Sequence, residues 1–218
     1  MDRAGRGPDR GATATGLDEL LTELAEAHIG RTLNPYRDAG PDDVPDAPAL
    51  RQANLRFYLE QRRDADVVAV GEAAGYQGLR WSGIAFTSER DLLRWGDSFR
   101  PTCRTRVWSE PSGTIVHGLL DQLGAERRVI LWNTVPTHPH RPGKPLSNRP
   151  PTAAEIAAGR KLTERFLGLV RPRVLIAVGR IAMAALGHDA LYVRHPANAG
   201  APGFRQQMAA ILAAELRT

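Results

Sequence analysis

Residues 66–83 read DVVAVGEAAGYQGLRWSG, a short apolar run and then a loop with glycine at four of thirteen positions from Gly71 to Gly83. An apolar, β-branched run that ends in turn residues is typical of a buried strand. Spaced glycines let a backbone turn tightly and approach a ligand closely. The spacing differs from the dinucleotide-binding fingerprint, and no helix is expected directly after it. The pattern alone predicts a strand and a tight loop, with a binding role and a structural role both open.

Similar strand patterns recur along the chain, with helical patterns between them. The expected strands are Asp66–Gly71, Val129–Asn133, Val174–Gly179 and Ala190–Arg194. The expected helices are Leu17–Ile29, Ala49–Arg62, Ser88–Trp95, Gly113–Leu123, Ala153–Val170, Arg180–Leu186 and about Gly203–Leu216. Strands that alternate with helices pair in parallel, with helices on both faces of the sheet. We therefore predict an α/β fold, a three-layer α/β/α sandwich with a four-stranded parallel sheet.

The ends of the four expected strands bring polar residues to one rim of this sheet. In such sheets, ligands bind in the crevice beyond the carboxyl ends of the strands. The residues at or next to those ends include Glu72, Asn133, Gly179 and His195. An acid, an amide, a glycine and an imidazole should therefore meet at one place, where we expect the site.

The length and composition fit one globular domain. The chain has 218 residues, of which 42% are hydrophobic and 24% are charged, as in ordinary globular proteins. We expect a single domain over residues 17–218 after a disordered tail over residues 1–16, which lacks the apolar centre of a signal peptide. No apolar run approaches the ~20 residues of a membrane span. The expectation is a cytoplasmic monomer without membrane contact.

The charge favours a polyanionic partner without identifying one. The formal net charge is +5, and of 29 basic residues only Lys144 and Lys161 are lysines. Arginine suits bidentate phosphate contacts, but a base-composition bias explains the same preference more simply. Because Cys103 is the single cysteine, an internal disulfide and a cysteine-held cluster are both excluded.

Residues 71–83 resemble the first motif of the uracil-DNA glycosylase superfamily, especially the branch that reads Gly-Glu-Ala-Pro-Gly and continues to Gly-x-x-Phe-x-Gly. The resemblance extends over about Asp66 to Leu212 and implies a DNA-repair enzyme that flips uracil and hydrolyses its N-glycosidic bond. It places the catalytic acid on Glu72, because a carboxylate stabilises oxocarbenium character and positions water. It places the stacking aromatic, a flat apolar platform, on Trp81. An arginine-paired carboxylate and a core tryptophan are the structural alternatives.

Two further segments resemble later motifs of the same superfamily. Residues 131–136 (LWNTVP), continued by 147–151 (SNRPP) and Glu155, resemble the second motif, and residues 193–200 (VRHPANAG) resemble the third. The resemblance gives Asn133 the recognition of uracil, because an amide can donate to a carbonyl and accept from N3–H. It gives His195 a hydrogen bond to uracil O2 as charge develops on the leaving base. A turn-forming asparagine and a structural histidine are the alternatives.

The resemblance also implies two sets of contact residues. The substrate-binding set is Gly71, Ala73, Tyr76, Trp81 and Asn133, and the DNA-binding set is Asn148, Arg149, Gly179, Arg180, Asn198 and Arg205. The loop from Asn198 to Pro202 would fill the vacated base stack, although its small residues make a weak wedge, and Arg205 would anchor phosphate. Between the halves of the second motif lie His138, His140, Arg141 and Lys144. Two histidines without further ligands are weak evidence for a metal site. We therefore expect a solvated basic loop that touches phosphate.

Three departures from the branch affect the prediction. Ala74 stands where the branch has proline, which loosens a backbone that must aim Glu72. Ala197 replaces the usual serine and removes a phosphate contact. The branch holds an iron–sulfur cluster with four cysteines, whereas here Thr137 stands where a ligand is expected. We therefore expect a relative that lacks the cluster and has no metal or other cofactor.

The sequence predicts a monofunctional glycosylase that excises uracil from DNA with water as the nucleophile. Lys144 is the only lysine near the motifs, so a Schiff-base lyase is less favoured. One alternative is a non-catalytic or slow-turnover binder of uracil or abasic DNA. Another is a glycosylase for a different deaminated base, such as hypoxanthine or xanthine. A third is an α/β domain of unrelated function.

Overall fold

The structure, a computed structural model, describes residues 14–216 and contains a sheet of four parallel strands. In the order β3-β2-β5-β6, these strands are β3 (Val129–Val135), β2 (Val67–Ala73), β5 (Val174–Val178) and β6 (Leu191–Val193). The expected four-stranded parallel sheet is confirmed. Strands β2 and β3 each run two residues beyond their expected ends, which carries the first and second motifs further toward the rim.

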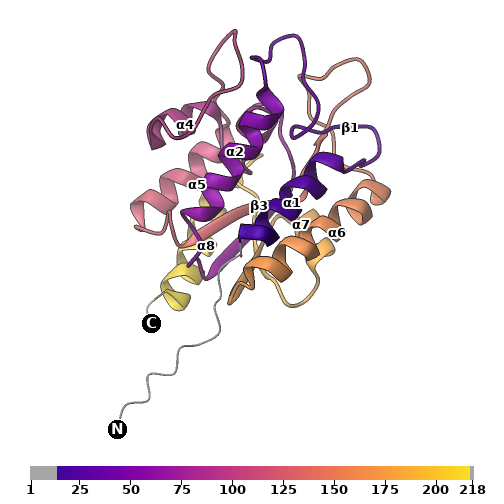
Figure 1. Cartoon of the computed structure of the whole chain (residues 1–218). Helices are drawn as coiled ribbons and strands as arrows, with labels where there is room; N and C mark the ends of the chain where they lie inside the picture. Colours follow the sequence, from indigo (N-terminus) through magenta and orange to yellow (C-terminus); the bar gives the residue numbers. More distant parts are fainter. Residues whose placement is uncertain (1–13, 217–218) are drawn as a thin grey trace.

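Helices cover both faces of the sheet and complete the expected three layers. They are α1 (Ala14–Glu26), α2 (Ala47–Glu60), α3 (Leu79–Ser82), α4 (Glu89–Trp95), α5 (Pro111–Gln122), α6 (Ala153–Val170), α7 (Arg180–Leu186) and α8 (Ala201–Glu215). Figure 1 shows α1, α6 and α7 on one side of the sheet and α2, α5 and α8 on the other. Helix α6 packs on β3, α7 packs on β5 and β2, and α8 packs on β6.

Helix α6 fixes the chain that follows the second motif. Thr152 caps its first turn and forms a capping box with Glu155, in which each side chain bonds the backbone N–H of the other residue. Gly159 faces the end of β3 so closely that a Cβ there would lie 3.0 Å from the Val135 Cα. Phe166 stacks on Trp132 with ring centroids 4.0 Å apart. These contacts seat the helix against the strand that carries Asn133.

Three features differ from the expectation. Helix α1 starts at Ala14 rather than Leu17, and residues 1–13 of the expected tail lie outside the described residues. Helix α3, with four residues, lies inside the expected glycine loop. Strands β1 (Thr32–Leu33) and β4 (His138–Pro139) form a second, antiparallel sheet. Two-residue strands leave no periodic signal, and this pair depends on residues far apart in the sequence.

The apolar core lies between the sheet and its two helical layers. Val67, Val68, Ala69 and Val70 of β2 have no exposed surface, as expected for a central strand covered on both faces. None of the helices within residues 14–216 combines the length and apolarity that a bilayer crossing requires.

Candidate active site at the carboxyl ends of the strands

A cavity of about 520 Å³ opens where the parallel strands end. The residues that line it and that were assigned from the sequence are Glu72, Ala73, Asn148, Arg149, Gly179, Arg180, His195 and Asn198. Gly71 and Asn133 lie next to it as partners in the register of β2 and β3. The structure therefore brings Glu72, Gly179 and His195 to one cavity, while Asn133 lies beside it on β3 and is not among the lining residues.

Glu72 enters this cavity from the end of β2 with a half-buried side chain. Burial raises the pKa of Glu72. Within residues 14–216, the Glu72 carboxylate forms no ion pair or hydrogen bond, so the structure gives it no arginine partner. A partly desolvated and unpaired carboxylate is free to interact with a sugar or a water molecule.

His195 faces the same cavity from the turn after β6, and its main chain fixes the state of its ring. The backbone N–H of Ala197 donates to the His195 Nδ1, at 3.1 Å. Burial lowers the pKa of His195, which favours the neutral ring. Since Nδ1 accepts a hydrogen bond, the proton of the neutral imidazole lies on Nε2. The ring is therefore set to donate from Nε2.

Gly71 lets two side chains approach the end of β2. A Cβ at Gly71 would lie 2.6 Å from the Phe86 Cε2 and 2.8 Å from the Asn133 Oδ1. Phe86 has a φ of 53° and lies with its ring centroid 5.8 Å from that of His195. No described residue hydrogen-bonds to the Asn133 side-chain amide, although Asn133 is only 4% exposed. A buried amide without a partner is available to a ligand.

Trp81 lies away from the cavity lining. It is 2% exposed, its indole N–H donates to the Tyr76 carbonyl at 2.8 Å, and its ring stacks on Trp108 with centroids 5.6 Å apart. These contacts place Trp81 in the core, as in the structural alternative. Tyr76 packs edge-on against Trp108 and is half-buried. Stacking of a base on Trp81 stays a prediction that this position does not favour.

Arg149 binds protein groups with its whole guanidinium. Nη1 and Nη2 pair with the two carboxylate oxygens of Glu155, each at 2.7 Å. Nη1 also donates to the Pro150 carbonyl, Nη2 to the Arg31 carbonyl and Nε to the His140 carbonyl. The five N–H donors of an arginine are thus satisfied within the chain. Phosphate binding by Arg149 stays a prediction. The observed contacts connect the loop of the second motif to the first turn of α6.

The remaining DNA-binding candidates are distributed around the rim. The Asn148 side-chain oxygen accepts the backbone N–H of Tyr76 at 3.0 Å and so joins the second motif to the first. Gly179 has a φ of 95°, and a Cβ there would lie 3.2 Å from the His195 Cβ. Arg180 and Asn198 line the cavity and are exposed. Arg205 is exposed on α8 and lies outside the cavity lining.

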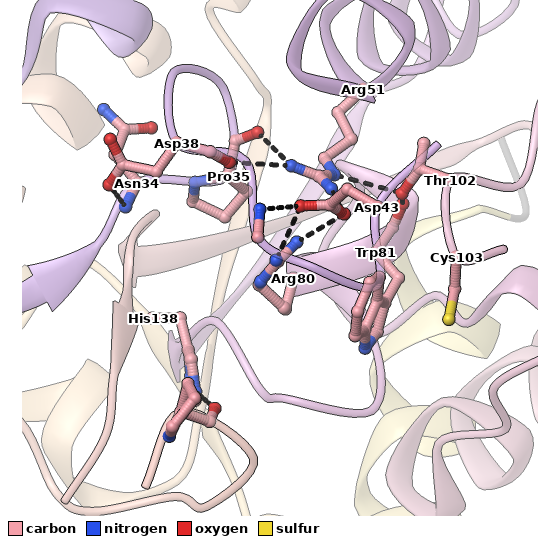
Figure 2. Close-up of polar contacts among 12 residues, drawn as sticks. Asn34, Pro35, Asp38, Asp43, Arg51, Arg80, Trp81, Thr102, Cys103 and His138 are labelled. Atoms are coloured by element: carbon pink, nitrogen blue, oxygen red, sulfur yellow. Dashed lines mark hydrogen bonds and ion pairs between the residues drawn. The ribbon is translucent and has the colours of Figure 1, made fainter. Parts of the chain in front are cut away.

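A buried cluster of ion pairs, formed by Asp43 with Arg51 and Arg80, ties the glycine loop to the chain that precedes it (Figure 2). Arg80 of α3 pairs with Asp43, with Nη2 at 2.8 Å from Oδ2, and Arg51 of α2 pairs with the same carboxylate. Arg51 also donates to the Pro35 carbonyl at 2.8 Å and to the Thr102 hydroxyl at 3.1 Å. The loop after Glu72 is thereby tied to α2 and to the segment before it.

Comparisons with known proteins agree with this architecture. The description "Uracil DNA glycosylase superfamily" matches residues 58–215, which is most of the chain. The chain belongs to the uracil DNA glycosylase superfamily. The crystal structure of wild-type Pedobacter heparinus SMUG2 is similar in fold, with a TM-score of 0.66 and 13% sequence identity, over 93% of this chain and 99% of that one. The search of curated proteins finds no match.

The iron–sulfur cluster of the similar branch does not fit the residues present. Cys103 is the single cysteine, and its Sγ lies 3.3 Å from the Thr105 hydroxyl. Thr137 is buried and its hydroxyl accepts a hydrogen bond from Thr32 at 2.7 Å, which joins β1 to the second motif without a cluster. The described residues contain no group of three potential metal ligands. His138 faces the Ala74 carbonyl at 2.8 Å with its Nδ1.

Two residues in or beside this cavity were not assigned from the sequence. Phe86 follows the glycine loop and lies against Gly71 and His195. A glycine-led segment that ends in an aromatic residue, GIAF at 83–86, was the signal available for it. Glu110 lines the cavity from the residue before α5. Its sequence, Glu-Pro before a helix, resembles an ordinary helix start and carries no catalytic signal.

Proposed function

We propose that this protein excises uracil from DNA by hydrolysing the N-glycosidic bond, with Glu72 and His195 as its catalytic residues. The observation that carries the proposal is their shared cavity. One side of it presents an unpaired carboxylate, and another presents an imidazole whose Nε2 is set to donate. Such a pair of groups serves both ends of a breaking glycosidic bond, the sugar and the leaving base.

The chemistry follows from these two atoms. The bond between C1′ and N1 breaks with its electron pair on the base, and the sugar gains oxocarbenium character. The Glu72 carboxylate stabilises that positive charge. It also accepts a proton from a water molecule while the water oxygen bonds to C1′. The Nε2–H of His195 donates to O2 of the uracil anion, which lowers the energy of the leaving group. The uracil anion then takes up a proton from solvent, and Glu72 releases the proton that it took from water. The products are free uracil and an abasic site.

Recognition of the base is assigned to Asn133 and Phe86. The Asn133 amide has no protein partner, so it can donate to a uracil carbonyl and accept from N3–H. The Phe86 ring lies beside Gly71 and His195, where a flat base entering the cavity can stack on it. The stacking role given to Trp81 by resemblance therefore passes to Phe86.

The test of stacking compares the two aromatic residues. Loss of a base–aromatic stack costs about 1–3 kcal/mol, or about 5- to 150-fold in kcat/KM. Phe86→Leu should show this loss, while Trp81→Phe should mainly lower the midpoint of urea unfolding. The opposite pattern, with activity lost only in Trp81→Phe, would return the role to Trp81.

The test of the reaction uses an oligonucleotide with one uracil, incubated with protein and then with alkali. We expect strand cleavage with the wild type, and losses of orders of magnitude in Glu72→Gln and His195→Ala. Glu60→Gln, which alters an exposed acid on α2, is the matched control and should keep the wild-type rate. No alkali-labile site on single- or double-stranded substrate would refute uracil excision. Near-normal rates in both site variants would refute the assigned roles.

The alternative of a non-catalytic binder is weakened by the surroundings of Ala74. The Ala74 N–H donates to the Val135 carbonyl at 3.1 Å, and its carbonyl faces the His138 Nδ1. The loop that aims Glu72 is thus held on both sides without proline. Excision of other deaminated bases stays an alternative within the same chemistry. A panel with hypoxanthine and xanthine oligonucleotides separates it from uracil excision.

A further inference from the structure

Glu110 is a second acid at this cavity and occupies an unusual position. It is the residue before α5, where a short polar side chain commonly accepts a free N–H group of the first turn. The Glu110 side chain makes no such bond. Its carboxyl group instead lies against the glycine loop, where a Cβ at Gly78 would be 2.6 Å from the Glu110 Cδ. The Glu110 side chain therefore leaves the helix start uncapped and lies against the loop.

Gly75 leaves the way open between this acid and the cavity. A Cβ at Gly75 would lie 3.1 Å from the Glu110 Oε1, and both residues line the cavity. A side chain at position 75 would stand between the carboxyl group and a ligand. Two of the four glycines that mark the first motif therefore make room for Glu110.

The Glu110 carboxyl group has no hydrogen-bond partner among the described residues, and Oε2 is a buried polar atom without one. A carboxylate that is withdrawn from water and has no partner is disfavoured, which shifts Glu110 toward its protonated form. Burial, together with the negative charge of Asp91 on α4, raises the pKa of Glu110 to about 7, while His117 of α5 acts in the opposite direction. The protonated acid then has an O–H donor that no described protein group accepts.

The charged groups around the cavity make the neutral form the useful one. Glu72 lines the same cavity and must be a carboxylate for the proposed reaction. Arg180 is an exposed cation on the rim, and Arg149, which also lines the cavity, is paired with Glu155. DNA adds phosphate charge, and an ionised Glu110 would repel it. Negative charge from bound DNA further favours the proton on Glu110.

We propose that Glu110 acts on bound DNA as an uncharged carboxylic acid whose O–H donates a hydrogen bond to an acceptor oxygen of the extruded nucleotide. This inference rests on the proposed function for the identity of the ligand. The inference adds Glu110 to the residues that bind the nucleotide, and it makes binding depend on whether Glu110 is protonated. Ionisation of Glu110 removes the donor and adds repulsion, so DNA binding and excision decline as the pH rises past its pKa.

The test is the pH profile of kcat/KM from pH 6 to 9 for the wild type, Glu110→Gln and Glu110→Met. Glutamine keeps a donor but cannot ionise, whereas methionine fills the space without a donor. We expect the wild-type value to fall by about tenfold per unit well above the pKa, Glu110→Gln to stay level, and Glu110→Met to be low throughout. Urea unfolding of each variant shows that it is folded, and Glu60→Gln should follow the wild-type curve.

A binding experiment separates this inference from the proposed reaction. Fluorescence anisotropy with Glu72→Gln protein, with and without Glu110→Gln, measures the affinity for uracil DNA and for abasic DNA over the same pH range. A pH effect that Glu110→Gln abolishes on both DNAs assigns the acceptor to a phosphate or sugar oxygen, and an effect on uracil DNA alone assigns it to the base. Binding that weakens in parallel with and without Glu110→Gln, or full activity in Glu110→Met, would overturn the inference. Absence of excision by the wild type would instead refute the reaction.

Discussion

Replacement of Gly71 by alanine should disturb the site and the stability together. The new Cβ would lie 2.6 Å from the Phe86 Cε2 and 2.8 Å from the Asn133 Oδ1. Carbon atoms in contact prefer about 3.5–4.0 Å, so the ring must move by about 1 Å. Phe86 is 5% exposed, and the neighbouring His195 ring limits its movement.

Overpacking of this kind costs about 1–3 kcal/mol, or about 5- to 150-fold in the unfolding equilibrium. We expect the urea midpoint to fall in proportion, with an unchanged m-value. Excision by the folded variant, measured in single-turnover reactions below the unfolding transition, should also be slower. The reason is that Asn133 and Phe86 are both displaced from the base.

The matched control is Gly118→Ala on α5. No atom lies within 4 Å of a Cβ built at Gly118, and glycine in a helix interior is less favourable than alanine by about 1 kcal/mol. This variant should be slightly more stable than the wild type and equally active. A Gly71→Ala protein with wild-type stability and rate would refute the packing described around the end of β2.

Four further outcomes follow from the electrostatics. Arg149→Ala should destabilise the fold by about 3 kcal/mol, because it leaves Glu155 buried without its partner. The salt dependence of DNA binding, checked by anisotropy, should stay unchanged if Arg149 remains bound to Glu155, and a shallower dependence would instead support the phosphate contact expected from the sequence. The pKa of Glu155 is lowered to about 2, so the stability from this pair is present above about pH 4.5 and is lost as the pH falls toward 2; acid unfolding of the wild type and Arg149→Ala measures the difference. Asp43→Asn should cost about 3–5 kcal/mol in urea unfolding, since two buried arginines lose their carboxylate. Excision should decline as the pH falls through the raised pKa of Glu72, at a higher pH than for an exposed glutamate, and a pH-independent rate from pH 4 to 6 would contradict the assignment.

The sheet was predictable because each of its strands carries its own signal. Val67–Val70 is an apolar run on a central strand, and a parallel strand buried on both faces needs such a run. Once the strand order is parallel, the ends of the strands meet at one rim, which brought Glu72 and His195 together in the prediction. Local pattern and general topology were sufficient for this part.

The side-chain contacts within the rim were not predictable in the same way. Phe86 and Trp81 are both aromatic residues near the glycine loop. Trp81 stacks on Trp108 and donates to the Tyr76 carbonyl, whereas Phe86 lies beside Gly71 and His195, and local spacing indicates neither arrangement. Arg149 looked available for phosphate because its partner Glu155 lies six residues further along the chain, in the first turn of α6. The role proposed for Glu110 depends on its contacts with Gly75 and Gly78, which belong to another segment of the chain. No local spacing in the sequence indicates such a contact.

The ion cluster behind the glycine loop bears on how the domain can be shortened. The superfamily match begins at residue 58, yet Arg80 within it is paired with Asp43, which precedes that boundary. A fragment cut at residue 58 would remove Asp43 and Arg51 together, so the Arg80 guanidinium would lose its counter-ion and the segment that aims Glu72 would lose this anchor. Anyone who trims this protein for expression or fuses it to another should therefore keep the polypeptide from α1 onward, because the superfamily match leaves out the residues that anchor its first motif.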